Sequence, residues 1–410
     1  METMYRCCAG LDVHKETVEA HLRRMEADGK LWQQTRRWGT MTGQLEAMAE
    51  WLAGEGVTQV AMESTGVYWK PIYNILEGRF TILLVNARHM KQVPGRKTDV
   101  KDCQWMAQLL QHGLLRGSFV PPRGQRELRE LTRHRTQLVG EKTRIANRIH
   151  KTLEDAHIKL GSVASDILGV SGRAMLDAVI AGERDEKKLA DLAQRKLRGR
   201  IPELQQALRG RMTEHHRFLL RLLRKELEQQ EGFIAELSQR IEEFTRPLAE
   251  ERKRLIQIPG IEQRAAEVLL AEIGPDLKSF PTAKQLSKWS GMCPGNNESA
   301  GKKKSGRTPP GSRWLRQVLV QSAWAASRSK KSYLAAQYRR LAARRGKKRA
   351  LMAVGHSILV ILYHLLKEQR EYVDLGANYL DQLDPQGLIR YHVKRLESLG
   401  HTVTLSAHPA

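Results

Sequence analysis

The chain is long and strongly basic: its 410 residues include 69 Lys and Arg against 45 Asp and Glu, with a net charge of +24 and an isoelectric point near 10.1. This length allows two or three domains, each with its own core. The charge favours a polyanionic partner, most simply nucleic acid, over the alternative of a basic protein on a membrane surface.

The apolar runs and the cysteines indicate the cellular compartment in which the protein acts. The closest approach to a membrane span, residues 357–366, is too short and contains His364, and the N-terminus carries no apolar signal segment. The chain has four cysteines: Cys7, Cys8, Cys103 and Cys293. Their spacing fits neither a zinc site nor a disulfide framework. We therefore predict a cytoplasmic protein with no membrane partner.

The first part of the chain alternates between strand-like and helix-like patterns. Strands are predicted over 5–13, 17–22, 31–38, 59–62 and 80–85. Helices are predicted over 42–52, with Thr42 as its N-cap, over 68–76, and from Asp99 onward. The order β-β-β-α-β-α-β-α is typical of a ribonuclease H-like α/β fold, in which a sheet edge and the final helix hold catalytic acids.

Four acidic residues occupy informative places in this pattern. Asp12 ends the first strand, Glu63 ends the fourth, and Asp99 and Asp102 lie three residues apart at the start of the last helix. If the two strands are neighbours, the acids converge at one end of the sheet. Four ionised carboxylates need divalent cations to lie together, and oxygen ligands favour Mg²⁺ or Mn²⁺. Each acid taken alone is more often a turn former or a helix cap.

Residues 118–254 are predicted to be helical. Pro121 and Pro122 mark a linker, and long helical patterns follow over 125–156 and from Phe218 onward, with apolar residues spaced as in a coiled coil. We predict a helical arm that is either antiparallel or dimerising. Its arginines fit a solvated helix face and contacts to a nucleic-acid backbone equally well. They are Arg126, Arg129, Arg133, Arg135, Arg144 and Arg148.

Residues 255–373 carry the steepest charge asymmetry, with sixteen Lys or Arg and no Asp or Glu over 301–350. Pro259-Gly260 between apolar helices is similar to a helix-hairpin-helix turn, which presents backbone N–H groups to a phosphate. A flexible cationic loop is predicted over 289–307, then helices over 312–329, 332–343 and 350–367. Trp314 and Trp324 are predicted to be core residues. Phosphate contacts are predicted at Lys302, Lys303, Lys304, Arg307, Arg313 and Arg316.

Three sequence blocks resemble the DEDD insertion-sequence transposases: Gly10 to Lys15, Met62 to Trp69 and Lys97 to Asp102. Their N-terminal domain is similar to the Holliday-junction resolvase RuvC. The resemblance implies that Asp12, Glu63, Asp99 and Asp102 are the catalytic, metal-binding tetrad.

The segment 259–328 is similar to the C-terminal domain of the same family, where a serine in a Ser-Gly-rich loop is the nucleophile. The best match is Ser299, although Ala300 follows it where many members have Gly. Ser305, in its own Ser-Gly pair, is the competitor. Neighbouring cations would stabilise the phosphate during attack.

The resemblance implies a prokaryotic DNA transposase that exchanges strands of donor and target DNA through a covalent serine intermediate. It also implies a dimer or tetramer guided by a bridge RNA. The predicted divisions are a RuvC-like domain at 1–117, a coiled-coil arm at 118–254, a helical transposase domain at 255–373 and a tail at 374–410. The alternatives are a metal-dependent, junction-resolving nuclease without a serine intermediate and a non-catalytic nucleic-acid-binding protein.

Overall fold

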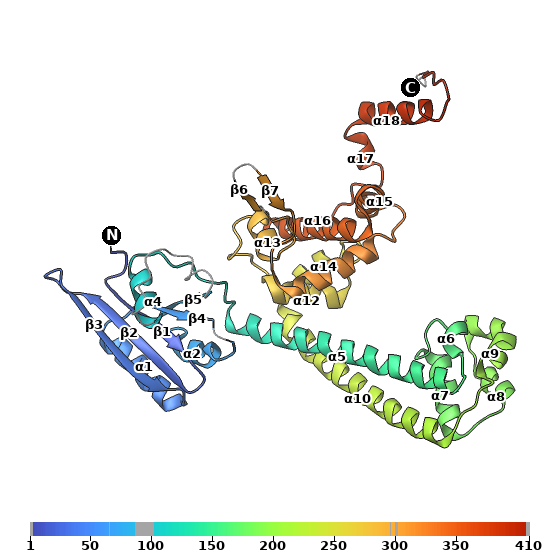
Figure 1. Ribbon diagram of the computed structural model, residues 1–410, viewed down its shortest axis with the longest axis horizontal. Helices are drawn as coiled ribbons and strands as arrows, with labels where there is room; N and C mark the ends of the chain where they lie inside the picture. Colours follow the sequence, from blue (N-terminus) through green and yellow to red (C-terminus); the bar gives the residue numbers. More distant parts are fainter. Residues whose placement is uncertain (1–2, 65, 87–101, 296, 300–301, 407–410) are drawn as a thin grey trace. The chain divides into compact units, whose positions relative to one another are not determined.

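The computed structural model of the chain describes residues 3–64, 66–86, 102–295, 297–299 and 302–406, with the backbone alone for 297–299 and 303–305. The chain forms two compact units, Met1–Pro121 and Pro122–Ala410 (Figure 1). The first is a mixed α/β unit and the second is mostly helical, which confirms the predicted order of an α/β part followed by helices. The ribonuclease H-like assignment and the finer division into four parts stay predictions.

The first unit is built on a five-stranded mixed sheet with the order β3-β2-β1-β4-β5. Its strands are β1 Cys7–Val13, β2 Thr17–Met25, β3 Leu31–Gly39, β4 Gln59–Glu63 and β5 Thr81–Val85. The central strand β1 runs antiparallel to β2 and parallel to β4. The first and fourth strands are therefore neighbours, which is the condition under which the acids at their ends converge.

Helices cover both faces of this sheet. Apolar residues of α1 (Thr42–Gly54) and α2 (Trp69–Leu76) share a core with one face, and α4 (Asp102–Gln111) packs on the other. The predicted cap at Thr42 is wrong. Met41 holds the N-cap position with extended backbone, no side chain caps the helix, and Thr42 is the first helical residue.

Two long helices of the second unit, α5 (Arg123–Asp155) and α10 (Glu214–Thr245), pack against each other in opposite directions (Figure 1). Ion pairs join Lys142 to Glu231 at 2.7 Å and Arg148 to Glu226 at 3.5 Å. The residue numbers of the partners fall along α10 as they rise along α5, as antiparallel helices require. Buried residues of α10 recur every seven positions, as a helix seam requires. They are Leu220, Leu227, Ile234 and Ile241. The seam therefore lies within one chain.

Short helices at the far end of this arm close its core (Figure 1). They are α6 Leu160–Val163, α7 Val170–Ala181, α8 Glu186–Asp191, η1 Arg195–Arg200 and α9 Ile201–Leu208. Gly182 ends α7, with φ +107°. This left-handed conformation favours glycine over residues with a Cβ atom.

Glu231 of α10 makes the arm sensitive to acid. Arg173 of α7 binds both of its carboxylate oxygens and Lys142 lies 2.7 Å away, which together lower the pKa of Glu231 to about 2. A carboxylate with a depressed pKa stabilises the fold above its ordinary pKa and loses that contribution as pH falls. We expect the free energy of unfolding to drop by roughly 2 kcal/mol between about pH 5 and pH 3 through this group. Urea titrations should give a shallower pH slope for Glu231→Gln; an unchanged slope would refute the assignment.

The rest of the second unit is a helical bundle followed by a tail. Its helices are η2 Arg246–Leu248, α11 Ala249–Ile256, α12 Gln263–Ile273, α13 Ala283–Trp289, α14 Arg313–Ala326, α15 Tyr333–Arg345, α16 Lys347–Glu368, α17 Tyr379–Gln382 and α18 Pro385–Glu397. Among the described helices, α16 alone is long and apolar enough to cross a membrane, and half of its apolar window is buried inside the unit. A buried core helix passes the same test.

Two predictions in this region are wrong. The cationic loop contains a short antiparallel hairpin, β6 (Asn297–Ser299) and β7 (Lys302–Ser305). Neither tryptophan is a core residue, since Trp324 is 53% exposed and Trp314 is half-buried. The apolar stripe of α14 runs through Leu315, Leu319 and Ala323, and Trp324 falls outside it.

Candidate active-site residues

The central strands bring Asp12 and Glu63 to the same end of the sheet. Leu11 of β1 pairs with Met62 of parallel β4, and each acid is the next residue of its strand. Side chains alternate along a strand, so Asp12 shares a face with Gly10, and Glu63 shares a face with Ala61.

That face is the one covered by α4. A Cβ atom on Gly10 would lie 2.3 Å from the carbonyl oxygen of Cys103 and 2.6 Å from the amide nitrogen of Ala107, so glycine is required for this close approach. Ala61 lies in one apolar cluster with Trp105 and Met106 of α4. Since α4 begins at Asp102, its first carboxylate stands at the helix end that packs beside the central strands.

Three of the four predicted acids therefore approach the same face from β1, β4 and α4. Asp99 lies outside the described residues. Among the part of the chain that is described, no group of three His, Cys, Asp or Glu side chains could hold a metal ion. The oxygen-only donors Asp12, Glu63 and Asp102 suit a hard divalent cation. The tetrad and its metal stay predictions.

The sequence interpretation gave no role to His14. Its Nε2 lies 3.2 Å from Oδ2 of Asp12, whose side chain is 23% exposed. The two residues are two positions apart at the end of β1, which is the spacing that places neighbouring side chains on one face of an extended chain. The spacing of two residues is the feature of the sequence from which the contact between His14 and Asp12 could have been predicted.

The predicted nucleophile and its competitor both lie on the hairpin. Ser299 ends β6 and pairs with Lys302, whereas Ser305 ends β7 and pairs with Asn297. The base of the hairpin is closed by the amide of Gly295, which donates to the carbonyl of Arg307 at 3.0 Å. The backbone thus presents the two serines on paired strands.

The side chain of Arg316 braces the segment that contains this hairpin. Its Nη2 donates to the carbonyl of Gly291 at 3.1 Å and to that of Pro309 at 2.9 Å, before and after the hairpin in the chain. These bonds give the Arg316 guanidinium a structural role, and its predicted phosphate contact stays a prediction. Lys302, Arg307 and Arg313 are exposed.

The Pro259-Gly260 turn joins two helices as predicted, but packing accounts for its glycine. Gly260 has φ +87°, and a Cβ atom there would lie 2.2 Å from the carbonyl oxygen of Ser322 on α14. The turn therefore seats α12 against α14.

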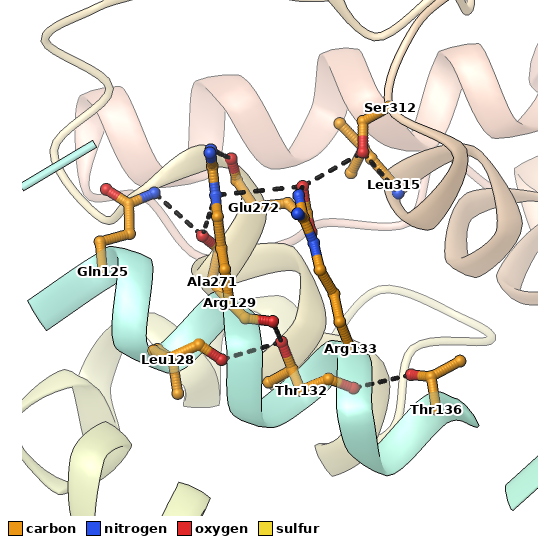
Figure 2. Close-up of polar contacts among 10 residues, drawn as sticks. All are labelled: Gln125, Leu128, Arg129, Thr132, Arg133, Thr136, Ala271, Glu272, Ser312 and Leu315. Atoms are coloured by element: carbon orange, nitrogen blue, oxygen red, sulfur yellow. Dashed lines mark hydrogen bonds and ion pairs between the residues drawn. The ribbon is translucent and has the colours of Figure 1, made fainter. Parts of the chain in front are cut away.

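Several arginines of α5 are engaged inside the second unit. Figure 2 shows Arg129 and Arg133 reaching the C-terminal end of α12, where Arg129 Nε donates to the carbonyl of Ala271 at 3.0 Å. Arg133 donates two hydrogen bonds, of 2.7 and 2.9 Å, to the buried carboxylate of Glu272. Arg135 pairs with buried Glu267 at 2.7 Å. These three arginines are therefore paired within the second unit, and their contact with a nucleic-acid backbone stays a prediction.

Comparison with known proteins gives two family matches. Residues 9–158 match the DEDD family of IS110, described as “Transposase”, and residues 252–339 match the “Transposase IS116/IS110/IS902 family”. The chain belongs to the IS110 family of transposases. The probable family 20 transposase of Pseudomonas aeruginosa strain PAO1 is 26% identical to this transposase over 273 residues, which are 66% of this chain and 71% of the relative.

The family membership confirms the resemblance found in the sequence. This IS110 transposase is a DNA-acting enzyme, and DNA is its partner. The first matched range includes Asp12, Glu63 and Asp102, and the second includes Ser299 and the basic hairpin. The individual roles of these residues stay predictions.

Proposed function

We propose that this transposase cuts and exchanges DNA strands with an acidic tetrad in its first unit and a serine nucleophile in its second. The observation that carries the proposal is the placement of Asp12 and Glu63 at adjacent strand ends, on the sheet face packed against α4. Asp102 begins α4, and Asp99 precedes it by three residues in the sequence. Carboxylates that approach one face from neighbouring strands and a helix are suited to binding a divalent cation, which favours a catalytic role.

In the proposed reaction, the hydroxyl oxygen of Ser299 attacks a backbone phosphorus. A serine–phosphate bond forms as a phosphorus–oxygen bond of the DNA breaks, and the leaving sugar oxygen takes up a proton. Strand exchange reverses the step with a different sugar hydroxyl. Lys302, Lys303, Lys304, Arg307 and Arg313 would neutralise the phosphates, as their basic segment suggests.

A divalent cation, Mg²⁺ or Mn²⁺, held by Asp12, Glu63, Asp99 and Asp102 would supply Lewis-acid stabilisation of phosphate charge. The strand register places Asp12 and Glu63 at the same end of the sheet, and the close packing at Gly10 brings α4 to the same face. A RuvC-like fold for the first unit fits this arrangement of strands and acids.

The partners in this proposal are donor DNA, target DNA and a guide RNA, with the enzyme acting as a dimer or tetramer. The net charge of +24 favours binding to such polyanions.

The test is covalent trapping of end-labelled substrate DNA. We expect wild type to form a protein–DNA adduct that survives denaturation, Ser299→Ala to form none, and Ser305→Ala to form it at about the wild-type level. An adduct with Ser299→Ala but not with Ser305→Ala would move the nucleophile to Ser305. Cleavage by wild type without any adduct would favour the metal-dependent nuclease.

A further inference from the structure

A groove of about 620 Å³ lies between α5, α12 and α14 of the second unit. Its walls include Thr136 of α5, Arg264 of α12 and Gln317 of α14, and Val268 and Val318 contribute apolar surface. This volume lies within the range of small-ligand sites in proteins. Among the described residues, its lining includes none of the predicted acids and neither serine of the hairpin.

One wall of the groove includes Gly140, a glycine in the interior of a long helix. It lies inside the 33-residue helix α5, where glycine is less favourable than alanine for helix formation. A Cβ atom at Gly140 would have no heavy atom within 4 Å, so internal packing does not require glycine here. Its missing side chain leaves space in the groove for an occupant.

The chemistry around the groove selects the kind of occupant. Among the described lining residues, Glu262 is the only exposed acidic side chain, and Arg264 lies on the same wall. Gln317 and Gln321 are exposed one helical turn apart on α14, and their amides can donate to and accept from the edge of a base.

Aromatic surface continues the same helix. Trp314 lines the groove with the Arg313 guanidinium 4.6 Å from its ring centre, and Trp324 lies 53% exposed with Arg328 at 4.0 Å. Aromatic side chains are platforms on which unpaired bases stack, and neighbouring arginines add cation–π interactions. A base-paired duplex keeps its bases stacked inside, so it cannot use such a pocket.

We propose that this groove binds an unpaired nucleotide, with its base beside Gly140 and its edge read by Gln317 and Gln321. The proposal deepens the function proposed above, since it rests on a nucleic-acid partner for this chain. The shared chemistry is an unpaired strand, which either RNA or DNA can supply.

The test compares two glycine substitutions in the full-length protein. Gly140→Leu fills the groove. Gly232→Leu makes the same change at an exposed position of α10 outside the groove, where a Cβ atom would likewise have no heavy atom within 4 Å. Affinity is measured with fluorescent RNA, single-stranded DNA and duplex DNA of about 12 nucleotides, in EDTA to prevent cleavage. We expect Gly140→Leu to weaken binding of at least one unpaired strand about tenfold, while duplex binding and the melting temperature are kept.

Gly232→Leu should bind all three probes like wild type. A loss confined to RNA or to single-stranded DNA identifies the source of the strand. Wild-type affinity for both unpaired strands in Gly140→Leu, or an equal loss for duplex DNA, overturns the proposal. If Gly140→Leu unfolds, the exposed pair Gln317→Ala and Gln321→Ala must produce the selective loss. Because binding needs no cleavage, failure here leaves the adduct result with Ser299 unaffected.

Discussion

Replacing Asp12 by Asn is expected to lower strand cleavage by about 10³-fold or more. The substitution keeps the shape of the side chain but removes its charge, and with it most of its ability to bind a divalent cation. Metal ions contribute several kcal/mol to phosphoryl transfer, and each 1.36 kcal/mol is a tenfold change in rate. The measurement is single-turnover cleavage of labelled substrate DNA with Mg²⁺ and with Mn²⁺.

The matched control is Asp28→Asn in the turn between β2 and β3. Asp28 is 54% exposed and pairs only with nearby Lys30 in the described contacts, so cleavage should stay near the wild-type rate. The melting temperature of both variants should match wild type, because Asp12 lies at the end of a strand whose core contacts are apolar. Cleavage by Asp12→Asn within tenfold of wild type would contradict the metal-site proposal.

The strands and helices of the first unit could be predicted because their signals are local. A short apolar run such as that of β4 indicates a strand from only a few residues. The end of each predicted strand then gives the position of the acid that follows the run. The close approach at Gly10 could not be predicted, because it depends on Cys103 and Ala107, which reach Gly10 only after the sheet has formed. The sequence predicted that four acids converge at one end of the sheet, whereas the structure shows the face that Asp12, Glu63 and Asp102 share.

The arginines of α5 illustrate the opposite case. Periodicity predicted the long helix, but it gave solvent and nucleic acid equal weight as the surroundings of Arg129 and Arg133. The partner of Arg133 is Glu272, 139 residues later in the chain. No local pattern encodes a pairing across that distance, so the ion pairs that fasten α5 to α12 became visible only in three dimensions.

These contacts make Glu272 a residue whose removal should strongly destabilise the second unit. Its carboxylate is fully buried, accepts two bonds from Arg133 and accepts one from the hydroxyl of Ser312 at 3.1 Å (Figure 2). Arg129 caps the C-terminal end of α12 by donating to the carbonyl of Ala271. Burial lowers the pKa of Arg129 to about 10, which still leaves this arginine charged at neutral pH. Cations at a helix C-terminus also favour the helix dipole.

Glu272→Ala is therefore expected to lower the free energy of unfolding by about 3–5 kcal/mol, because it leaves the Arg133 charge without its buried partner. Urea unfolding followed by circular dichroism measures this change. The control is Glu226→Ala, whose partner Arg148 lies 3.5 Å away at the surface, and which should cost less than about 1 kcal/mol.

A double variant separates the pair from the rest of the network. If the loss arises from an uncompensated charge, Arg133→Met combined with Glu272→Met should be more stable than the sum of the two single changes predicts. Additive losses, or a Glu272→Ala protein as stable as the Glu226→Ala control, would show that the pair does not fasten α5 to α12.

Because Ser312 caps α14 directly after the hairpin segment, loosening at Glu272 should also reduce adduct formation at Ser299 without changing Ser299 itself.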